Sequence, residues 1–421
     1  MTAPDIHRTI EAVWRIESAR LIAALTRIVR DVGEAEELAQ DALVAAMEQW
    51  PDSGVPDKPG AWLMGTAKHR ALDIIRRRSM LDRKHDELGR EIGEQQEQAA
   101  ARIEEAIDDY VGDDVLRLIF IACHPVLSTE ARVALTLRLI GGLTTDEIAR
   151  AFLTAEPTIA QRIVRAKRTL SDARVPFELP RPTELEGRLS SVLEVIYLVF
   201  NEGYSATAGD DWMRPTLCEE ALRVGRILAA LLPSAPEAHG LVALMEIQAS
   251  RIGARTRPNG EPVPLTEQDR GRWDRLLITR GLAALDRAEN LAQHRGPYTL
   301  QAAIAACHAR APSVDETDWQ RIVALYDELL AVAPSPVVAL NRAVALSRAS
   351  DAAEALDAVD ALVGEGSLAN YHLLHAVRGD LLMTLERFDE ARAEFERAAS
   401  MTRNARERAL LLDRASSAVR H

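Results

Sequence analysis

Apolar residues return every three or four positions through most of the chain, which is the spacing of amphipathic helices. The pattern predicts helices over residues 6–30, 31–50, 61–78, 113–127, 128–140, 144–152 and 156–172. Asp31, Ser128 and Thr144 stand where helix N-caps belong. The stretch 51–60 contains several prolines and glycines, so it predicts a loop between the second and third helices.

Two proline-rich stretches divide the rest of the chain. Residues 174–184 follow the last of these helices and predict a domain boundary, and residues 257–269 predict an exposed loop. Residues 79–112 are polar and charged, which is typical of a linker. Beyond residue 184 the pattern stays helical.

A weak internal repeat runs through the C-terminal part of the chain. Its first copy and its second copy, 36 positions later, are Ala343, Ala355, Val359 and Leu362 and then Gly379, Ala391, Phe395 and Ala398. Small residues at two positions and larger apolar ones after them resemble the tetratricopeptide pattern, in which small side chains let paired helices approach closely. The proline expected after the second helix is missing, so this repeat is a hypothesis.

The composition favours helix over strand. Apolar residues make up 47% of the 421 positions, whereas aromatic residues make up only 4%. Strands draw on β-branched and aromatic side chains, so we expect an all-α fold. The length suggests roughly two to four domains.

The sequence contains no pattern of catalytic residues or metal ligands. Cys123, Cys218 and Cys307 lie far apart, which argues against a zinc site and a disulfide framework. No P-loop, HExxH or GxGxxG pattern occurs. The charged N-terminal stretch resembles neither a signal peptide nor a membrane span. We therefore expect a cytoplasmic protein that is not an enzyme and needs no cofactor, metal ion or membrane.

The charge is distributed unevenly along the chain. A net charge of −13 argues against a general nucleic-acid binder. Residues 58–78, however, hold six basic side chains against one acidic, and residues 156–170 hold four against one. Between them, residues 81–112 hold ten acidic and four basic side chains. Two basic patches with an acidic spacer are more informative than the total charge.

Residues 142–170 carry the strongest local pattern, that of a helix-turn-helix. A small residue, Ala149, would let a second helix cross the first, and Ile159 and Ile163 would pack that second helix. Its other faces carry the polar and basic residues Thr158, Gln161, Arg162, Arg165 and Arg168. Such a face can meet phosphates and base edges in a major groove. The alternative is an ordinary helical hairpin with a solvated basic face.

This segment resembles the fourth conserved region of bacterial sigma factors, in its extracytoplasmic-function form. The matching residues are Gly142, Leu143, Glu147, Ile148, Ala149, Thr158, Ile159, Arg162, Arg165, Ala166 and Lys167. Leu153 replaces the usual turn glycine, and Pro157 stands where a small residue is common. The resemblance implies that the five polar and basic residues of the second helix contact the upstream, minus-thirty-five promoter element.

Residues 35–50 resemble the part of the family's second region that docks on core RNA polymerase. The resemblance implies that the docking residues are Glu37, Gln40, Asp41 and Met47. Leu43 replaces the phenylalanine usual in the family. A solvated acidic helix face is the alternative interpretation.

Residues 61–78 resemble the family segment that opens and reads the minus-ten promoter element. The resemblance implies a set of DNA contacts here: Trp62, Lys68, His69, Arg76 and Arg77. His69 stands where asparagine is usual, which leaves the base preference open. Trp62 is expected more often in the core than as a base-stacking platform, because tryptophan is largely buried on average.

The motif blocks, in order, predict four parts of the chain: sigma region 2 at 1–80, an acidic linker at 81–112, sigma region 4 at 113–174, and a helical, tetratricopeptide-like extension at 175–421. The chain thus resembles the subgroup of extracytoplasmic-function sigma factors with a fused extension, which in this subgroup is thought to be regulatory. We expect a factor that directs core RNA polymerase to promoter DNA, and an extension that contacts the sigma module or an unknown regulator.

Two other functions stay open. One is a helix-turn-helix regulator with a ligand- or peptide-sensing extension and no sigma activity. The other is a tetratricopeptide scaffold, which leaves the basic helix at 156–170 unexplained. Residues 35–78 discriminate between a sigma factor and such a regulator, because a simple repressor needs neither a polymerase-docking helix nor a promoter-melting helix.

In the extension, a polar interruption at 197–224 is the one candidate site. Asn201, Glu202, Tyr204 and Trp212 could line a pocket or a contact with the sigma module. An ordinary loop between helices explains them as well, because loops rich in Gly, Asn and Asp need no function.

Overall fold

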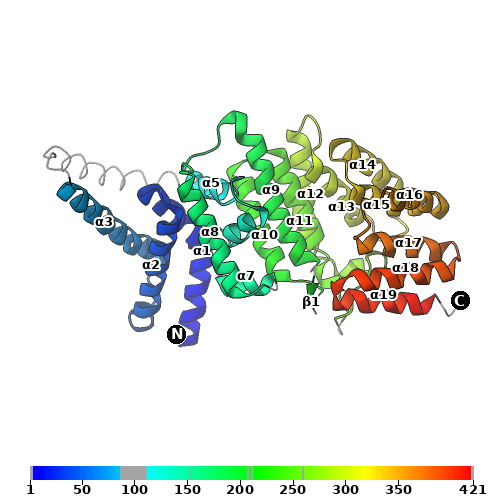
Figure 1. The fold of residues 1–421 in the computed structure, drawn as a ribbon, viewed down its shortest axis with the longest axis horizontal. Helices are drawn as coiled ribbons and strands as arrows, with labels where there is room; N and C mark the ends of the chain where they lie inside the picture. The colour runs from blue at the N-terminus through cyan, green and yellow to red at the C-terminus, as the bar shows by residue number, and fades with distance from the viewer. Residues whose placement is uncertain are drawn as a thin grey trace. The chain divides into compact units, whose positions relative to one another are not determined.

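The computed structural model describes residues 3–85, 111–152, 154–205, 208–209, 212–257 and 260–418. Nearly all regular secondary structure of these residues is helical, which confirms the all-α fold (Figure 1). The chain divides into two compact units, Met1–Ile196 and Tyr197–His421.

The first unit contains eight labelled helices, the last of which continues into the second unit. They are α1 (Ala3–Val29), α2 (Val32–Ser53), α3 (Pro59–His85), α5 (Val111–Ala122), α6 (Thr129–Leu139), α7 (Thr145–Ala151), α8 (Glu156–Asp172) and α9 (Pro182–Tyr204). Helices α1, α2 and α3 pack on one another, and α1 also packs on α5. Buried alanines on α2, such as Ala39 and Ala42, let α1 approach closely.

Three predicted boundaries in the first unit are wrong by several residues. Helix α2 continues past Pro51 to Ser53, because a proline in the last turn removes only one backbone hydrogen bond. Helix α3 begins at Pro59, since proline suits the first turn of a helix, and it runs on to His85. Helix α5 ends at Ala122, before Pro125, so the helix expected to reach residue 127 is shorter. The predicted linker lies mostly outside the described residues.

The expected N-caps are confirmed. The carboxylate of Asp31 accepts a hydrogen bond from the Glu34 amide at 2.9 Å, and the Ser128 hydroxyl accepts one from the Ala131 amide. Thr144 and Glu147 form a reciprocal capping box before α7, with bonds of 3.1 and 2.8 Å. These caps fix where α2, α6 and α7 begin.

The second unit continues as a row of helices. They are α10 (Pro215–Leu231), α11 (Pro236–Ala249), α12 (Arg275–Leu291), α13 (Pro297–Arg310), α14 (Trp319–Val332), α15 (Pro336–Ala349), α16 (Ala352–Glu365), α17 (His372–Thr384), α18 (Phe388–Met401) and α19 (Ala405–Ser417). From α13 onward each helix packs on the next. Two short strands, β1 (Ala208–Gly209) and β2 (Arg403–Asn404), pair in parallel.

The segment between α11 and α12 is not one exposed loop. It contains the short 3-10 helices η1 (Ile252–Ala254), η2 (Leu265–Glu267) and η3 (Arg270–Arg272), and Thr256 pairs with Pro262 in an antiparallel bridge. Gln268 and Arg270 are buried, so part of the predicted loop 257–269 is packed.

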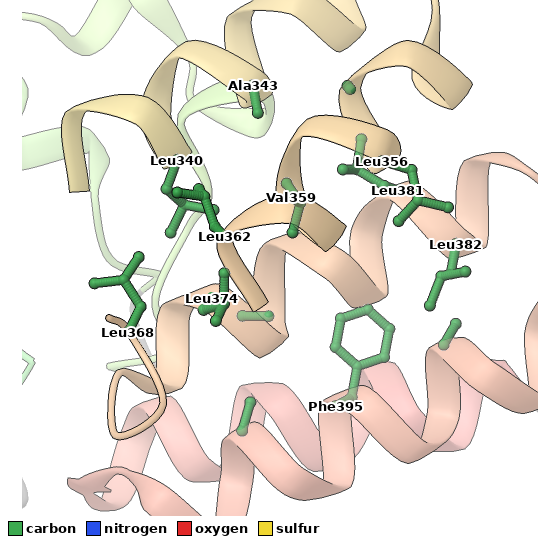
Figure 2. Close-up of a cluster of buried hydrophobic side chains, with 14 of the residues drawn as sticks. Leu340, Ala343, Leu356, Val359, Leu362, Leu368, Leu374, Leu381, Leu382 and Phe395 are labelled. Atoms are coloured by element: carbon green, nitrogen blue, oxygen red, sulfur yellow. The ribbon is translucent and has the colours of Figure 1, made fainter. Parts of the chain in front are cut away.

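Seven of the eight residues of the suspected repeat, all but Gly379, belong to one apolar cluster (Figure 2). Ala343, Val359 and Phe395 belong to it, and their helices follow one another along the chain. A Cβ atom at Gly379 would lie 2.7 Å from the Phe395 ring, so only glycine fits there without a shift. This close approach of α17 and α18 is compatible with tetratricopeptide-like pairs, and that assignment stays a prediction.

Candidate nucleic-acid interface

Helix α8 presents a polar, basic face opposite its packing face. Ile159, Ile163 and Ala166 are buried, and α8 packs on α6 and α7. Steps of three and four residues place the five predicted DNA contacts along the other side. Of these, Arg162 is half-buried. The exposed members are Thr158, Gln161, Arg165 and Arg168.

The guanidinium groups of this face are only weakly engaged within the protein. Arg168 makes an ion pair with Asp172 at 3.5 Å, and both side chains are largely exposed. Hydrogen bonds from its own amide and from Ser128 hold the pKa of Glu130 below its ordinary value, and the charge of Arg162 contributes to this shift. Exposed ion pairs contribute little to stability, so these arginines can exchange partners for a phosphate or a base.

The sequence did not single out Val164, which is 64% exposed on α8. Val164 follows Gln161 by three residues and precedes Arg168 by four, so it lies next to both on the helix surface, beside the basic face. An exposed aliphatic group at such a place suits contact with a thymine methyl group. The signal was available, because Val164 falls outside the apolar stripe of Ile159 and Ile163.

On α3, the predicted minus-ten contacts are only partly described. His69 is exposed, Lys68 is half-buried, and the side chains of Arg76 and Arg77 lie outside the described residues. Trp62 is half-buried rather than in the core, and its ring packs edge-on against Trp50 at 5.4 Å. Trp50, by contrast, is buried.

The predicted docking residues of α2 do not all lie together. Glu37, Asp41 and Met47 are exposed along one side of the helix, together with Val44, which the sequence interpretation missed. Gln40 is half-buried and donates a hydrogen bond inward to Glu36. The exposed apolar side chains of Val44 and Met47 thus lie next to the acidic ones, and a protein-docking surface often combines the two kinds.

Glu36 is a buried acid that joins three helices. Its carboxylate accepts a hydrogen bond from Arg138 Nε of α6 at 2.6 Å and forms an ion pair with Lys167 of α8. Burial alone raises the pKa of Glu36, but Lys167 and Arg138 outweigh burial and hold the pKa below its ordinary value. A charged cluster thus links the helix of the predicted polymerase contacts with the helix of the predicted DNA contacts.

A second ion pair joins α1 to α7. Arg15 of α1 lies 3.1 Å from Glu147 of α7, and Ser18 of α1 is buried beside Gly142. Gly142 has a φ of +69°, and a Cβ there would lie 2.9 Å from the Ser18 hydroxyl. The turn before the helix-turn-helix therefore needs glycine both for its backbone and for its contact with α1.

The four candidate residues of the extension divide into two pairs. Glu202 forms an ion pair with Arg214, and Asn201 hydrogen-bonds with Tyr197. Tyr204 is buried and Trp212 is half-buried. The rings of Tyr204 and Trp212 both lie close to the buried Arg255 of the same unit.

In the part of the chain that the structure describes, no group of three or more His, Cys, Asp or Glu side chains could hold a metal ion. None of its helices has the length and apolar character needed to cross a membrane.

Three family models match the chain. The model of sigma-70 region 2 matches residues 15–80, and the model of sigma-70 region 4 matches residues 117–170. A third, described as a family of unknown function (DUF6596), matches residues 188–289. The first match covers α2 and most of α3, and the second covers α7 and most of α8.

Similar proteins fall into two groups. An uncharacterized protein of Rhizobium meliloti is 43% identical over 393 residues, which cover 93% of this chain and 91% of that protein. A probable ECF RNA polymerase sigma factor, SigI of Mycobacterium tuberculosis, is 28% identical over 40% of this chain and 57% of its own length. The ECF RNA polymerase sigma factor SigK of a Mycobacterium species is 28% identical over 36% of this chain and 76% of its own length.

Proposed function

Because the chain belongs to the sigma-70 family of RNA polymerase sigma factors, in its extracytoplasmic-function group, we propose that it directs core RNA polymerase to specific promoters under the control of its C-terminal helices. Family membership supports a role in transcription initiation with core polymerase and promoter DNA as partners. The residues that make each contact, and the control by residues 175–421, are the proposal.

The basic face of α8 is the observation that supports the proposal most strongly. A helix held by a buried stripe, with arginines and polar side chains exposed along its other side, can enter a major groove. Arg165 and Gln161 lie one turn apart there, and we assign them to base edges and Arg168 to a phosphate. We assign the upstream promoter element to this face.

Helices α2 and α3 supply the other two contacts of the proposal. Glu37, Asp41 and Met47 form the surface assigned to core polymerase. On α3, Lys68 and His69 are assigned to the minus-ten element, with Trp62 beside them, half-buried. An unstacked base can be held by stacking while basic groups hold the backbone.

In vitro transcription with purified core polymerase tests the sigma assignment. The full chain should produce discrete new start sites on genomic fragments, and those starts should share two spaced upstream elements. A factor that binds specific DNA but produces no new start with core polymerase would instead be a helix-turn-helix regulator. The double variant E37A and D41A should lose the starts, while the control E48A, exposed about two turns beyond Asp41 on the same helix, should retain them.

Control by the C-terminal helices is the second part of the proposal. The predicted extension begins with α9, and Arg188 of that helix donates a hydrogen bond to the Phe120 carbonyl of α5 at 2.7 Å. Ser191 donates another to the Cys123 carbonyl at 3.1 Å. Arg132 of α6 also pairs with Glu194. The start of the extension is therefore packed on the region-4 helices, which gives it a physical route to influence them.

A further inference from the structure

The segment joining α11 to α12 holds the arginines Arg251, Arg255 and Arg270, and three of its acids are engaged elsewhere. Glu267 pairs with the exposed Arg257 at 3.5 Å. Asp269 caps η3, and Asp274 caps α12 by accepting hydrogen bonds from two amides. These acids are therefore occupied at the ends of helices or at the surface, away from the buried arginines of the segment.

Arg255 is the most isolated of these arginines. It is only 7% exposed, and its guanidinium lies over the Tyr204 ring, 3.5 Å from the ring centroid. The Trp212 ring lies 5.7 Å away. Within the described part of the chain, no carboxylate forms an ion pair with Arg255. Two aromatic faces attract the cation, but they do not neutralise it.

Arg251 and Arg270 lie against a third ring. Their guanidinium groups are 5.5 and 5.3 Å from the centroid of Trp273, which is buried. Burial lowers the pKa of Arg251, and the nearby charges of Arg255 and Arg270 lower it further. Arg251 is therefore close enough to both other cations to be repelled by them.

The partners of Arg251 and Arg270 are neutral. Arg251 donates to the Gln268 side-chain oxygen at 3.2 Å. Arg270 donates to the carbonyls of His308 and Ala311 at 2.8 and 2.7 Å. Burial lowers the pKa of Arg270, and the more distant charge of Glu316 only partly offsets this.

His308 adds no counter-charge. Burial, together with Arg251 and Arg270, lowers the pKa of His308 to about 4, so its ring is neutral near pH 7. The cluster therefore holds three guanidinium charges and no anion among the residues that the structure describes.

Several buried polar atoms of the same cluster have no hydrogen-bond partner. They are Tyr204 Oη, Arg255 Nε, Arg270 Nε, Trp273 Nε1 and His308 Nδ1. Four of these atoms, all but His308 Nδ1, always carry a hydrogen to donate near pH 7, and leaving a buried donor unpaired is unfavourable. Packing on aromatic rings explains the position of the arginines, but it leaves both the donors and the charge uncompensated.

We propose that Arg251, Arg255 and Arg270 form a binding site for the phosphoryl group of a small phosphorylated molecule. A phosphoryl group brings up to two negative charges and several acceptor oxygens, which matches a site made of donors and cations. Guanidinium groups bind such oxygens in pairs. Tyr204 and Trp212 lie beside Arg255, where they can contact the rest of the molecule.

Calorimetric titration and thermal unfolding of the full chain test this site. The probes are inorganic phosphate, AMP and GDP, each compared with sodium chloride at equal ionic strength. The variants are R255Q and R251Q, and the control is R257Q, which changes an exposed arginine of the same segment that pairs with Glu267. Binding should be at least about tenfold weaker in R255Q and R251Q and unchanged in R257Q.

The same variants separate a ligand site from simple packing. Loss of an uncompensated buried charge should leave R255Q as stable as the natural chain without phosphate, or more stable, and should remove the stabilisation by phosphate. A chain that phosphate and both nucleotides leave unchanged would overturn the site, as would equal stabilisation of R255Q, R251Q and R257Q. Tighter binding of a nucleotide than of phosphate would identify a nucleotide as the source of the phosphoryl group, and equal binding would identify free phosphate. None of these measurements involves polymerase, so they stand apart from the sigma assignment.

Discussion

Glu36 is a charged residue on the side of α2 where the helical pattern predicts apolar residues. It lies on the buried side of α2, beside Ala35 and Ala39. Arg138 and Lys167 are each 19% exposed, so they keep some contact with water while the carboxylate keeps almost none. Removing the acid would therefore leave two largely buried cations without the anion that they share.

We expect E36Q to lower the free energy of unfolding of the first unit by about 2–3 kcal/mol, because a buried ion-pair cluster loses its anion. Urea unfolding followed by tryptophan fluorescence measures this change. The matched control is E37Q, which removes the neighbouring exposed acid and should change stability by less than about 0.5 kcal/mol. Equal midpoints for the two variants would contradict the cluster's role.

The stabilisation by Glu36 should also depend on pH in one direction. Its pKa is lower in the folded protein than the ordinary 4.5, so the charged form favours folding. The contribution is complete above pH 4.5 and disappears as pH falls through the lowered folded value. The stability difference between the natural chain and E36Q should therefore shrink below pH 4.5, as unfolding midpoints across pH 3–7 would reveal.

Among the elements, α8 could be predicted from sequence with most of its detail. Its apolar stripe, its basic side and the capping box before α7 are local patterns, and the structure has all three. The partners of Glu36 and of Arg255 could not be predicted, because they come from helices far away in the chain. The half-burial of Trp62 could not be predicted for the same reason, since its ring packs on Trp50 of another helix.

For α8, R165A should weaken holoenzyme binding to the upstream element by about 1–3 kcal/mol if the arginine contacts a base. Filter binding or anisotropy with labelled promoter DNA measures the loss. R392A provides a control, because this arginine is largely exposed on α18 in the other unit. Loss of equal size on promoters with scrambled upstream elements would instead assign Arg165 to the phosphate backbone.

The pairing of α17 with α18 gives a stability prediction for the second unit. G379L should lower its free energy of unfolding by about 1–3 kcal/mol, because the added side chain meets the buried ring of Phe395. G364L in α16 is the control, since nothing lies within 4 Å of that position. Helix propensity favours leucine at both sites, so only the contact with Phe395 can separate the two variants in thermal unfolding.

At the scale of the whole molecule, removal of residues 197–421 should change transcript yield from the promoters found with the full chain. The cut leaves the first compact unit with the contacts of α9 intact. Either an increase or a decrease supports control by the second unit, whereas identical yields would refute it. Circular dichroism of the shortened chain provides the control for folding.

Glu36 also has a thermodynamic consequence for the assembled enzyme. Arg138 and Lys167 tie α2, with its proposed polymerase surface, to α8, with its proposed promoter surface. If polymerase binding separates the two helices, the ion pairs of Glu36 break at that step. Their stabilising free energy is then lost when polymerase binds rather than when DNA binds. By reciprocity of linked equilibria, promoter DNA would then raise the affinity for polymerase by the same factor as polymerase raises the affinity for DNA.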